Sequence, residues 1–338
     1  MQRVCFVKNA SFHKSQVNWH SQIRSKTACP MKTVMENELS RRAFLLLGSG
    51  ATLSAVLPFR AEAAPHAPKN GPLTCTDIAN HFKKTDTAGR VNWDKTTDTF
   101  KAGDPARPVR KVAVAWKASL DAVQKAISIG ADLLISHESI CVQADNSSMK
   151  PEIEFALPTE MPKFELIRKA GLVVYRCHDF WDSFPGLGMR ASWQKALHIG
   201  TNIIADAYPF YVTKVAPLTI GDLARHILKQ IKPLRQNGVL VSGDTERVIT
   251  RIGTGTGVTT NIVKLRELGA EVGIITEDYY NHVRMGVHAQ ELDFPTITVN
   301  HGVTEEWGAR NLATYLQQEF PALVVTHLPQ YCPYQVIV

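Results

Sequence analysis

Residues 111–138 read KVAVAWKASLDAVQKAISIGADLLISHE, and this stretch decides the fold class. Apolar side chains alternate with small ones over 111–116, which predicts a strand. Apolar residues three and four apart predict a helix over 119–129, and Gly130 suits its C-cap. The apolar run 131–135 then predicts a buried parallel strand. Strand, helix and strand in this order form a right-handed crossover in a sheet covered by helices.

The same alternation of strands and helices continues along the chain. A helix over 164–170 and a strand over 172–176 extend the first group, and an exposed strand over 206–217 begins a second group. The second group contains predicted strands at 239–242, 248–252, 271–275, 296–299 and 323–327, and predicted helices at 220–231, 259–268 and 304–319. We expect an α/β fold of two similar lobes, residues 75–205 and 206–338. Each lobe would have a mixed, mainly parallel sheet, with the functional site in the cleft between the lobes.

The N-terminal part of the chain is expected to lie outside this fold. Residues 40–45, Ser-Arg-Arg-Ala-Phe-Leu, precede a small and apolar stretch and an Ala-Glu-Ala cleavage site at 61–63. We expect a twin-arginine signal peptide over 35–63, a mis-assigned start over 1–34 and a linker over 64–74. This predicts a periplasmic or secreted protein with no membrane span after cleavage; an uncleaved anchor is the alternative.

Composition limits the classes of function. Hydrophobic residues make up 44% of the chain and charged residues 20%, as in soluble globular proteins. The net charge of +7 comes partly from the leader, and no basic run is interleaved with aromatic residues, so we expect no nucleic-acid partner. The chain has six cysteines but no Cys-x-x-Cys motif, which argues against thiolate zinc sites and redox motifs. A disulfide remains open.

Three predicted strands are followed by a histidine and a carboxylate. The first ends in His137-Glu138, the second leads to Asp182, and the third leads to His301 and Glu305. Open α/β sheets bind ligands beyond the carboxyl ends of their strands. Histidine nitrogens and carboxylate oxygens are typical ligands of hydrolytic metal centres, so we expect these three segments to supply the ligands of a metal centre.

Three further residues are predicted to transfer protons. His178 and Asp179 precede Asp182, and His282 lies four residues after Asp278. Each group also has an ordinary interpretation. A carboxylate in the first turn of a helix is favoured by the helix dipole, and Asp–His pairs occur on protein surfaces.

The glycine-rich segment 253–257, Gly-Thr-Gly-Thr-Gly, offers a competing function. It lies between a predicted strand and a predicted helix, where phosphate-binding loops occur. The dinucleotide motif requires glycine at the position of Val258, and no P-loop Gly-Lys-Ser/Thr sequence is present. Close backbone packing accounts for the glycines, which disfavours a nucleotide-dependent dehydrogenase.

Taken together, four blocks resemble the NGG-interacting factor three-like family of dinuclear metal centre proteins, some labelled GTP cyclohydrolase I type 2. The blocks are 130–137, 178–186, 253–255 and 301–305, and the resemblance covers roughly 75–335. It implies two divalent ions (Zn, Mn or Fe) held between the two lobes. It also implies a homo-oligomer, with a hexamer expected.

By position, the resemblance places the metal ligands at His137, Asp182, His301 and Glu305, with His178 beside them. The family usually has a second histidine where this chain has Glu138. An oxygen donor there favours harder ions such as Mn²⁺, Fe²⁺ or Mg²⁺ over zinc.

These observations favour a metal-dependent hydrolase that acts on an unknown small molecule through a metal-activated water. GTP ring opening, which the family label suggests, fits poorly with export because GTP is scarce outside the cytoplasm. The alternative is a non-catalytic metal-binding oligomer that serves as a scaffold or metal buffer.

Overall fold

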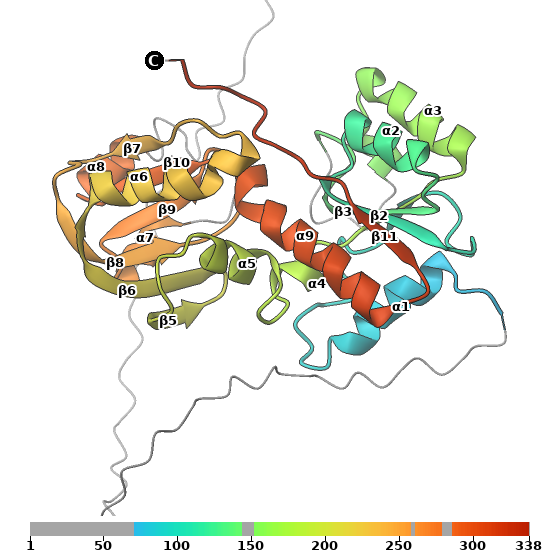
Figure 1. Ribbon diagram of the computed structural model, residues 1–338, viewed down its shortest axis with the longest axis horizontal. Helices are drawn as coiled ribbons and strands as arrows, with labels where there is room; N and C mark the ends of the chain where they lie inside the picture. Colours follow the sequence, from blue (N-terminus) through green and yellow to red (C-terminus); the bar gives the residue numbers. More distant parts are fainter. Residues whose placement is uncertain (1–70, 144–151, 258–260, 279–285, 338) are drawn as a thin grey trace, which may run out of the picture. The chain divides into compact units, whose positions relative to one another are not determined.

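The computed structural model describes residues 71–143, 152–257, 261–278 and 286–337 (Figure 1). These residues form an α/β fold with two mixed sheets, as the sequence predicts. The predicted leader, 1–63, and His282 lie outside the described residues. In the described part of the chain, no helix combines the length and apolar character needed to span a bilayer.

The first sheet contains the strand–helix–strand unit of residues 111–138. Its strands, in spatial order, are β1 (Phe100–Ala102), β4 (Val173–Arg176), β3 (Leu133–Glu138), β2 (Lys111–Lys117) and β11 (Val324–His327). All pairs are parallel except β1 with β4. Helix α2 (Leu120–Ser128) makes the crossover from β2 to β3, which confirms the predicted unit.

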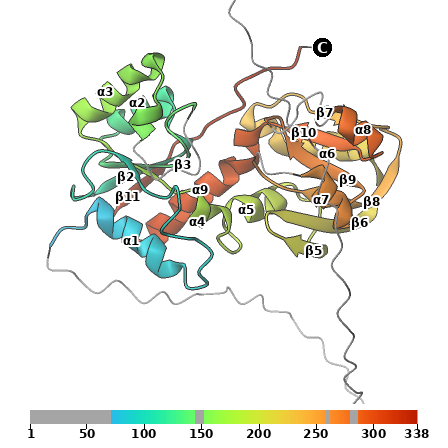
Figure 2. The same ribbon diagram turned by 180° about the vertical axis from the view of Figure 1, so that it is seen from behind.

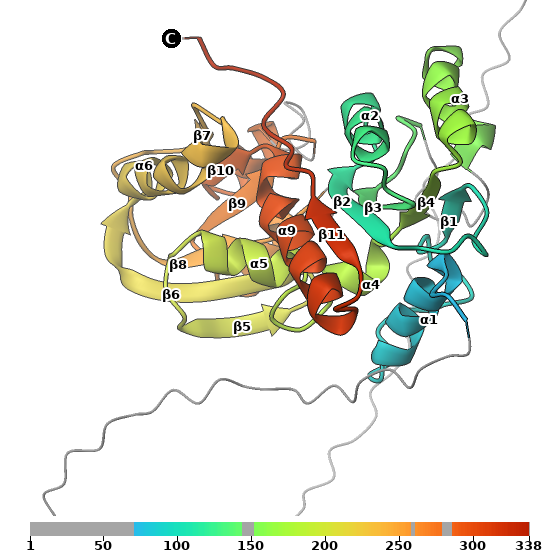
Figure 3. The same ribbon diagram turned by 45° about the vertical axis from the view of Figure 1, so that its right-hand side comes forward.

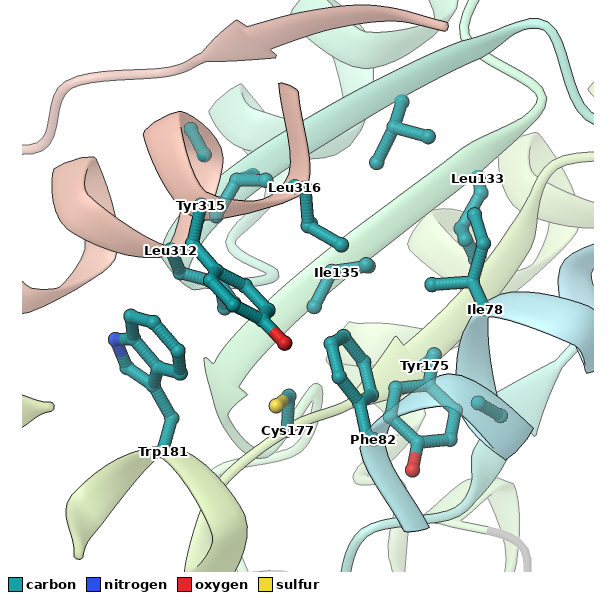
Figure 4. Packing of buried hydrophobic residues seen from close by; sticks show 14 of the residues in the cluster. Ile78, Phe82, Leu133, Ile135, Tyr175, Cys177, Trp181, Leu312, Tyr315 and Leu316 are labelled. Carbon is teal, nitrogen blue, oxygen red and sulfur yellow. The ribbon is translucent and has the colours of Figure 1, made fainter. Parts of the chain in front are cut away.

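Helices cover both faces of this sheet (Figure 2). On one face, α2 and α3 (Met161–Ala170) pack over Leu134. On the other, α1 (Cys75–Thr85) and α9 (His301–Glu319) pack over Leu133 and Ile135 (Figure 4). Because side chains alternate along a strand, His137 falls on the same face as Ile135, toward α9. The alternation of side chains along β3 therefore places His137 on the face of the sheet that α9 covers.

The second sheet has a parallel centre and antiparallel edges. Its strands, in spatial order, are β5 (Ile203–Ala207), β6 (Phe210–Thr219), β8 (Val248–Thr254), β9 (Val272–Thr276), β10 (Thr296–Val299) and β7 (Leu240–Ser242). Strands β8, β9 and β10 are parallel. Helix α6 (Ile220–Ile231) packs with one buried cluster of this sheet, and α7 (Ile262–Glu267) and α8 (His288–Glu291) pack with another.

Helix α9 takes part in the cores of both sheets. Val303, near its start, packs with the second sheet, whereas Leu312 and Leu316 pack with the first. It runs beside β11 and α5 (Met189–Ala196), as Figure 3 shows. Gly308 permits the close approach of α5, because a Cβ at this position would lie 2.1 Å from the Met189 sulfur.

Two features of the fold differ from the sequence expectation. Strand β11 pairs with β2 in the first sheet, although the sequence assigned 206–338 to a second lobe. The two sheets are therefore not built from two continuous segments of the chain. The division of the chain into two lobes near residue 205 remains a prediction. The short helix α4 (Asp179–Asp182) was not expected. The described structure also contains short 3-10 helices at Glu152–Phe155, Pro158–Glu160 and Lys232–Leu234.

The described cysteines are all free. Cys75, Cys141 and Cys177 are buried, and Cys332 is partly exposed. No disulfide links the described residues, so hydrophobic packing rather than cross-linking stabilises this part of the chain.

Candidate metal centre

Residues far apart in the sequence meet at the carboxyl end of β3. His137 comes from β3, Asp182 from the end of α4, and His301 and Glu305 from the first two turns of α9. His137 Nε2 lies 3.5 Å from Asp182 Oδ1 and 3.5 Å from Glu305 Oε2. His301 Nε2 lies 3.0 Å from the same Glu305 oxygen. The structure thus brings four of the five predicted metal ligands into direct contact.

Two overlapping groups in this cluster have the arrangement of metal ligands. One consists of His137, His178 and Asp182, and the other of His137, Glu138 and Glu305. Within each group, the ligand atoms lie within 4.8 Å of one another. His178, which the sequence suggested as a proton carrier, is therefore also placed as a candidate ligand.

The outer nitrogen of each histidine is held by an oxygen. His137 Nδ1 lies 3.2 Å from the carbonyl oxygen of Cys177, and His301 Nδ1 lies 2.7 Å from Asp278 Oδ2. His178 Nδ1 lies 2.9 Å from Asp179 Oδ1. A histidine that ligates a metal typically donates its other N–H to a carbonyl or carboxylate in this way.

Among the described residues, the inner nitrogens of two histidines are buried without a hydrogen-bond partner. These atoms are His137 Nε2 and His301 Nε2, both beside the Glu305 carboxylate. A buried polar atom without a partner is costly, so such atoms call for an explanation. A divalent cation among these nitrogens and carboxylates would satisfy both, and the residues present fit such an ion.

A tryptophan and an aspartate outside the predicted set position the ligands. Trp116 Nε1 donates a 2.8 Å hydrogen bond to Glu305 Oε2, and its ring packs edge-on against His301. Asp98 accepts hydrogen bonds from the backbone N–H groups of His178, Asp179 and Phe180. Asp98 therefore fixes the turn that leads into α4.

Glu138, where the chain departs from the resembled family, has a second partner. Its Oε2 accepts a 3.1 Å hydrogen bond from the guanidinium of Arg176, which is fully buried on β4. Its Oε1 lies 3.8 Å from both His178 Nε2 and His301 Nε2. Arg176 also donates to the carbonyl oxygen of His137. One oxygen of Glu138 is therefore committed to Arg176, and the other faces the histidines.

Burial and neighbouring charges shift the pKa values of three residues in the cluster. Burial, with the neighbouring His178, lowers the pKa of His137 to about 4, so its imidazole is neutral near pH 7. Burial raises the pKa of Asp182 to about 7, with help from Glu305 and Glu138. Burial opposes the charged form of His178, but Asp182, Asp179 and Glu138 outweigh it and raise the pKa to about 10. The crowded carboxylates thus attract positive charge.

Two acidic residues after β9 hold the start of α9. Glu277 accepts hydrogen bonds from the His301 backbone N–H and from the side chain of Asn300. Asn300 in turn caps the helix by accepting from the backbone N–H of Val303. Asp278, which the sequence suggested as a partner of the site, orients the His301 ring.

Comparison with known proteins gives the family. The family model described as Duf34/NIF3 (NGG1p interacting factor 3) matches residues 76–330. The chain belongs to the Duf34/NIF3 family. This finding confirms the resemblance seen in the sequence, and the ligand cluster described above lies entirely within the matched part of this Duf34/NIF3 protein.

Individual relatives of this Duf34/NIF3 protein are distant. A GTP cyclohydrolase 1 type 2 homolog of Chlamydia pneumoniae is 22% identical over 265 residues, covering 74% of this chain and 95% of the relative. Staphylococcus aureus hypothetical protein SA1388 is 19% identical with a TM-score of 0.63, over 79% of this chain and 100% of that chain. The Bacillus cereus protein related to NIF3 is 14% identical with a TM-score of 0.63, over 79% and 99%. At these identities, the solved structures establish the fold alone.

Several residues at the cluster were not predicted from the sequence. Trp116 and Arg176 each lie at or next to the carboxyl end of a parallel strand, so their positions carried a signal. Asp98, on a loop before β1, carried no comparable signal, and Gly257 stood out only as part of the glycine-rich segment 253–257. Their roles depend on contacts with residues far along the chain.

Proposed function

We propose that this Duf34/NIF3 protein binds divalent metal at the cluster and acts as a metal-dependent hydrolase. The observation that supports it most directly is the pair of buried, unpartnered Nε2 atoms on His137 and His301 facing carboxylates. The proposed ligands are His137, Glu138, Asp182, His301 and Glu305, with His178 adjacent. An ion there would polarise a substrate oxygen and lower the pKa of a bound water.

The protein's own residues would orient the ligands and move protons. Asp278 and the Cys177 carbonyl hold the two imidazoles with Nε2 inward, and Trp116 holds Glu305. His178 and Asp179, joined by a 2.9 Å contact, form the proposed proton-transfer pair. His282, the third residue predicted for this role, lies outside the described residues.

Metal analysis of the purified protein tests the binding proposal. We expect the wild type to retain Zn²⁺, Mn²⁺ or Fe²⁺ after dialysis, and His301→Ala and Asp182→Ala to lose most of it. His288→Ala is the matched control, because His288 is an exposed helix histidine paired with Glu291. Equal metal content in the wild type, the ligand variants and the control would refute the proposal.

Hydrolysis is distinguished from a non-catalytic role by a substrate screen. The metal-loaded wild type should hydrolyse one class among phosphoesters, amides and nucleotides, and His301→Ala should not. GTP belongs in the screen because the Chlamydia pneumoniae relative is named a GTP cyclohydrolase 1 type 2 homolog. Metal binding without turnover of any class would favour the scaffold or metal buffer.

Export and oligomerisation complete the proposal. Replacing Arg41 and Arg42 with lysine should retain the protein in the cytoplasm of a bacterial host with a twin-arginine system. Unchanged export would refute the signal assignment. Light scattering of the purified protein tests the homo-oligomer, with a hexamer as the expected assembly.

A further inference from the structure

The glycine-rich segment that follows β8 ends beside the metal cluster. Gly257 has a φ of +65°, and a Cβ on this residue would lie 3.4 Å from His301 Nε2 and 3.5 Å from Glu305 Oε1. A Cβ at 257 would therefore fill the space beside both ligand atoms, in van der Waals contact with each. Nothing in the sequence indicated that Gly257 contacts His301, which lies more than forty residues further along.

The position of Gly257 relative to the ligands is fixed by β9. The buried hydroxyl of Thr276 lies 2.9 Å from the Gly257 carbonyl oxygen and 2.7 Å from Asp278 Oδ1, and can donate to either. Asp278 Oδ2 holds His301 Nδ1. The same short segment thus positions both the glycine and the histidine, so the space between them is part of the folded structure.

The other sides of the two ligand groups are already occupied. Trp116 packs against the His301 ring and donates to Glu305 Oε2, and Asp278 occupies His301 Nδ1. Glu305 Oε1 and His301 Nε2 are the atoms that face Gly257. His301 and Gly257 are both partly exposed, whereas the Nε2 atom of His301 is itself buried.

We infer that Gly257, which has no side chain of its own, leaves room beside the described ligand atoms for a small oxygen ligand on an ion held by His301 and Glu305. The oxygen ligand would be water or an oxygen atom of the substrate. This inference rests on the proposed metal binding and assigns Gly257 as a positioning residue for the open coordination position that a catalytic metal site requires.

The test compares Gly257→Ala with Gly89→Ala in the Mn²⁺-loaded protein. Gly89 has nearly the same backbone angle, φ +61°, but no atom lies within 4 Å of its added Cβ. The control therefore reproduces the backbone strain without the contact. Water-proton relaxation per bound Mn²⁺ measures exchangeable water on the ion, and a chelator competition gives the Mn²⁺ affinity.

We expect Gly257→Ala to lower the relaxation per bound Mn²⁺ by roughly half, as one open position is blocked. Its Mn²⁺ affinity should stay within roughly tenfold of the wild type, the lower range for changes around a ligand shell. Gly89→Ala should match the wild type in both measurements. Equal relaxation in all three proteins would overturn the inference while leaving metal binding intact.

Three other outcomes would also overturn the inference about Gly257. Loss of Mn²⁺ from folded Gly257→Ala alone would show that the ion itself fills the space. Absence of Mn²⁺ from the wild type would overturn the proposed function as well, so the two failures are distinguishable. If Gly257→Ala does not fold, the wild type alone provides the test. Water-proton relaxation of the Mn²⁺-loaded wild type that shows no inner-sphere water would overturn the inference.

Discussion

Two histidine nitrogens largely determine what the cluster can bind. His137 and His301 each have Nδ1 engaged by an oxygen, which leaves the Nε2 lone pair facing Glu305. Rings held in one orientation lose less freedom on binding an ion, so the partner of Nδ1 would contribute to the affinity of the proposed metal site without touching the ion.

Removing that partner should weaken metal binding. We predict that Asp278→Ala lowers the affinity for Zn²⁺ or Mn²⁺ by about 10- to 100-fold, because the His301 ring is no longer oriented. Chelator competition measures the change. Asp94→Ala, at an exposed position, is the control and should have the wild-type affinity. Equal affinities would contradict the role assigned to Asp278.

The Glu138–Arg176 pair should contribute to stability as well as to the site. Glu138→Ala leaves the buried guanidinium without its closest carboxylate, and we predict a loss of about 3 kcal/mol in the free energy of unfolding. Urea denaturation measures it. Glu165→Ala breaks an exposed pair with Arg168 and should cost much less, because surface pairs are screened by water. Similar losses in the two variants would contradict the buried-pair argument.

Helix α9 joins the packing of the fold to the geometry of the site. Its first two turns carry His301 and Glu305, and apolar residues along the helix pack into both cores. The Asn300 cap and Glu277 fix where the helix begins. Since i and i+4 lie on one helical face, the start of the helix determines where both ligands lie.

The cap should therefore affect both stability and metal binding. We predict that Asn300→Ala lowers the free energy of unfolding by about 1 kcal/mol and also weakens metal binding. Asn261→Ala removes the equivalent cap of α7 and should lower stability without changing metal affinity. Urea denaturation and chelator competition measure the two effects. An unchanged metal affinity in Asn300→Ala would show that the helix cap does not influence metal binding.

For the molecule as a whole, the cluster joins three distant parts of the chain. His137, Asp182 and Glu305 belong to β3, α4 and α9, which meet only in the folded protein. The unfolded chain does not hold these ligands together, so an ion that binds them stabilises the folded state.

Metal should therefore raise the melting temperature. At a free metal concentration 100 times the Kd, we predict about 2.7 kcal/mol of added stability and an increase of roughly 5–10 °C. Thermal denaturation with and without Zn²⁺ or Mn²⁺ measures it. His137→Ala should show no increase on adding the same ion. An equal increase in that variant would indicate binding elsewhere.

Sequence patterns predicted most of the secondary structure because they are local. The alternation in 111–116, the helical spacing in 119–129 and the apolar run after Gly130 became β2, α2 and β3. The same patterns placed His137 and His301 directly at or after strand ends, where parallel sheets gather their ligands. The amphipathic helix 220–231 matches α6 at both ends.

Only the tertiary structure decided which of these elements meet. The sequence cannot specify that β11 joins the first sheet, because pairing depends on burying both neighbours across a long separation in the chain. Nor can it show that Glu138 pairs with Arg176 or that Gly257 faces His301. The sequence by itself determined the elements and the types of ligand, since these depend on neighbouring residues. Which side chains contact one another, and where space remains between them, depends on how distant segments pack. Only the folded structure shows these features.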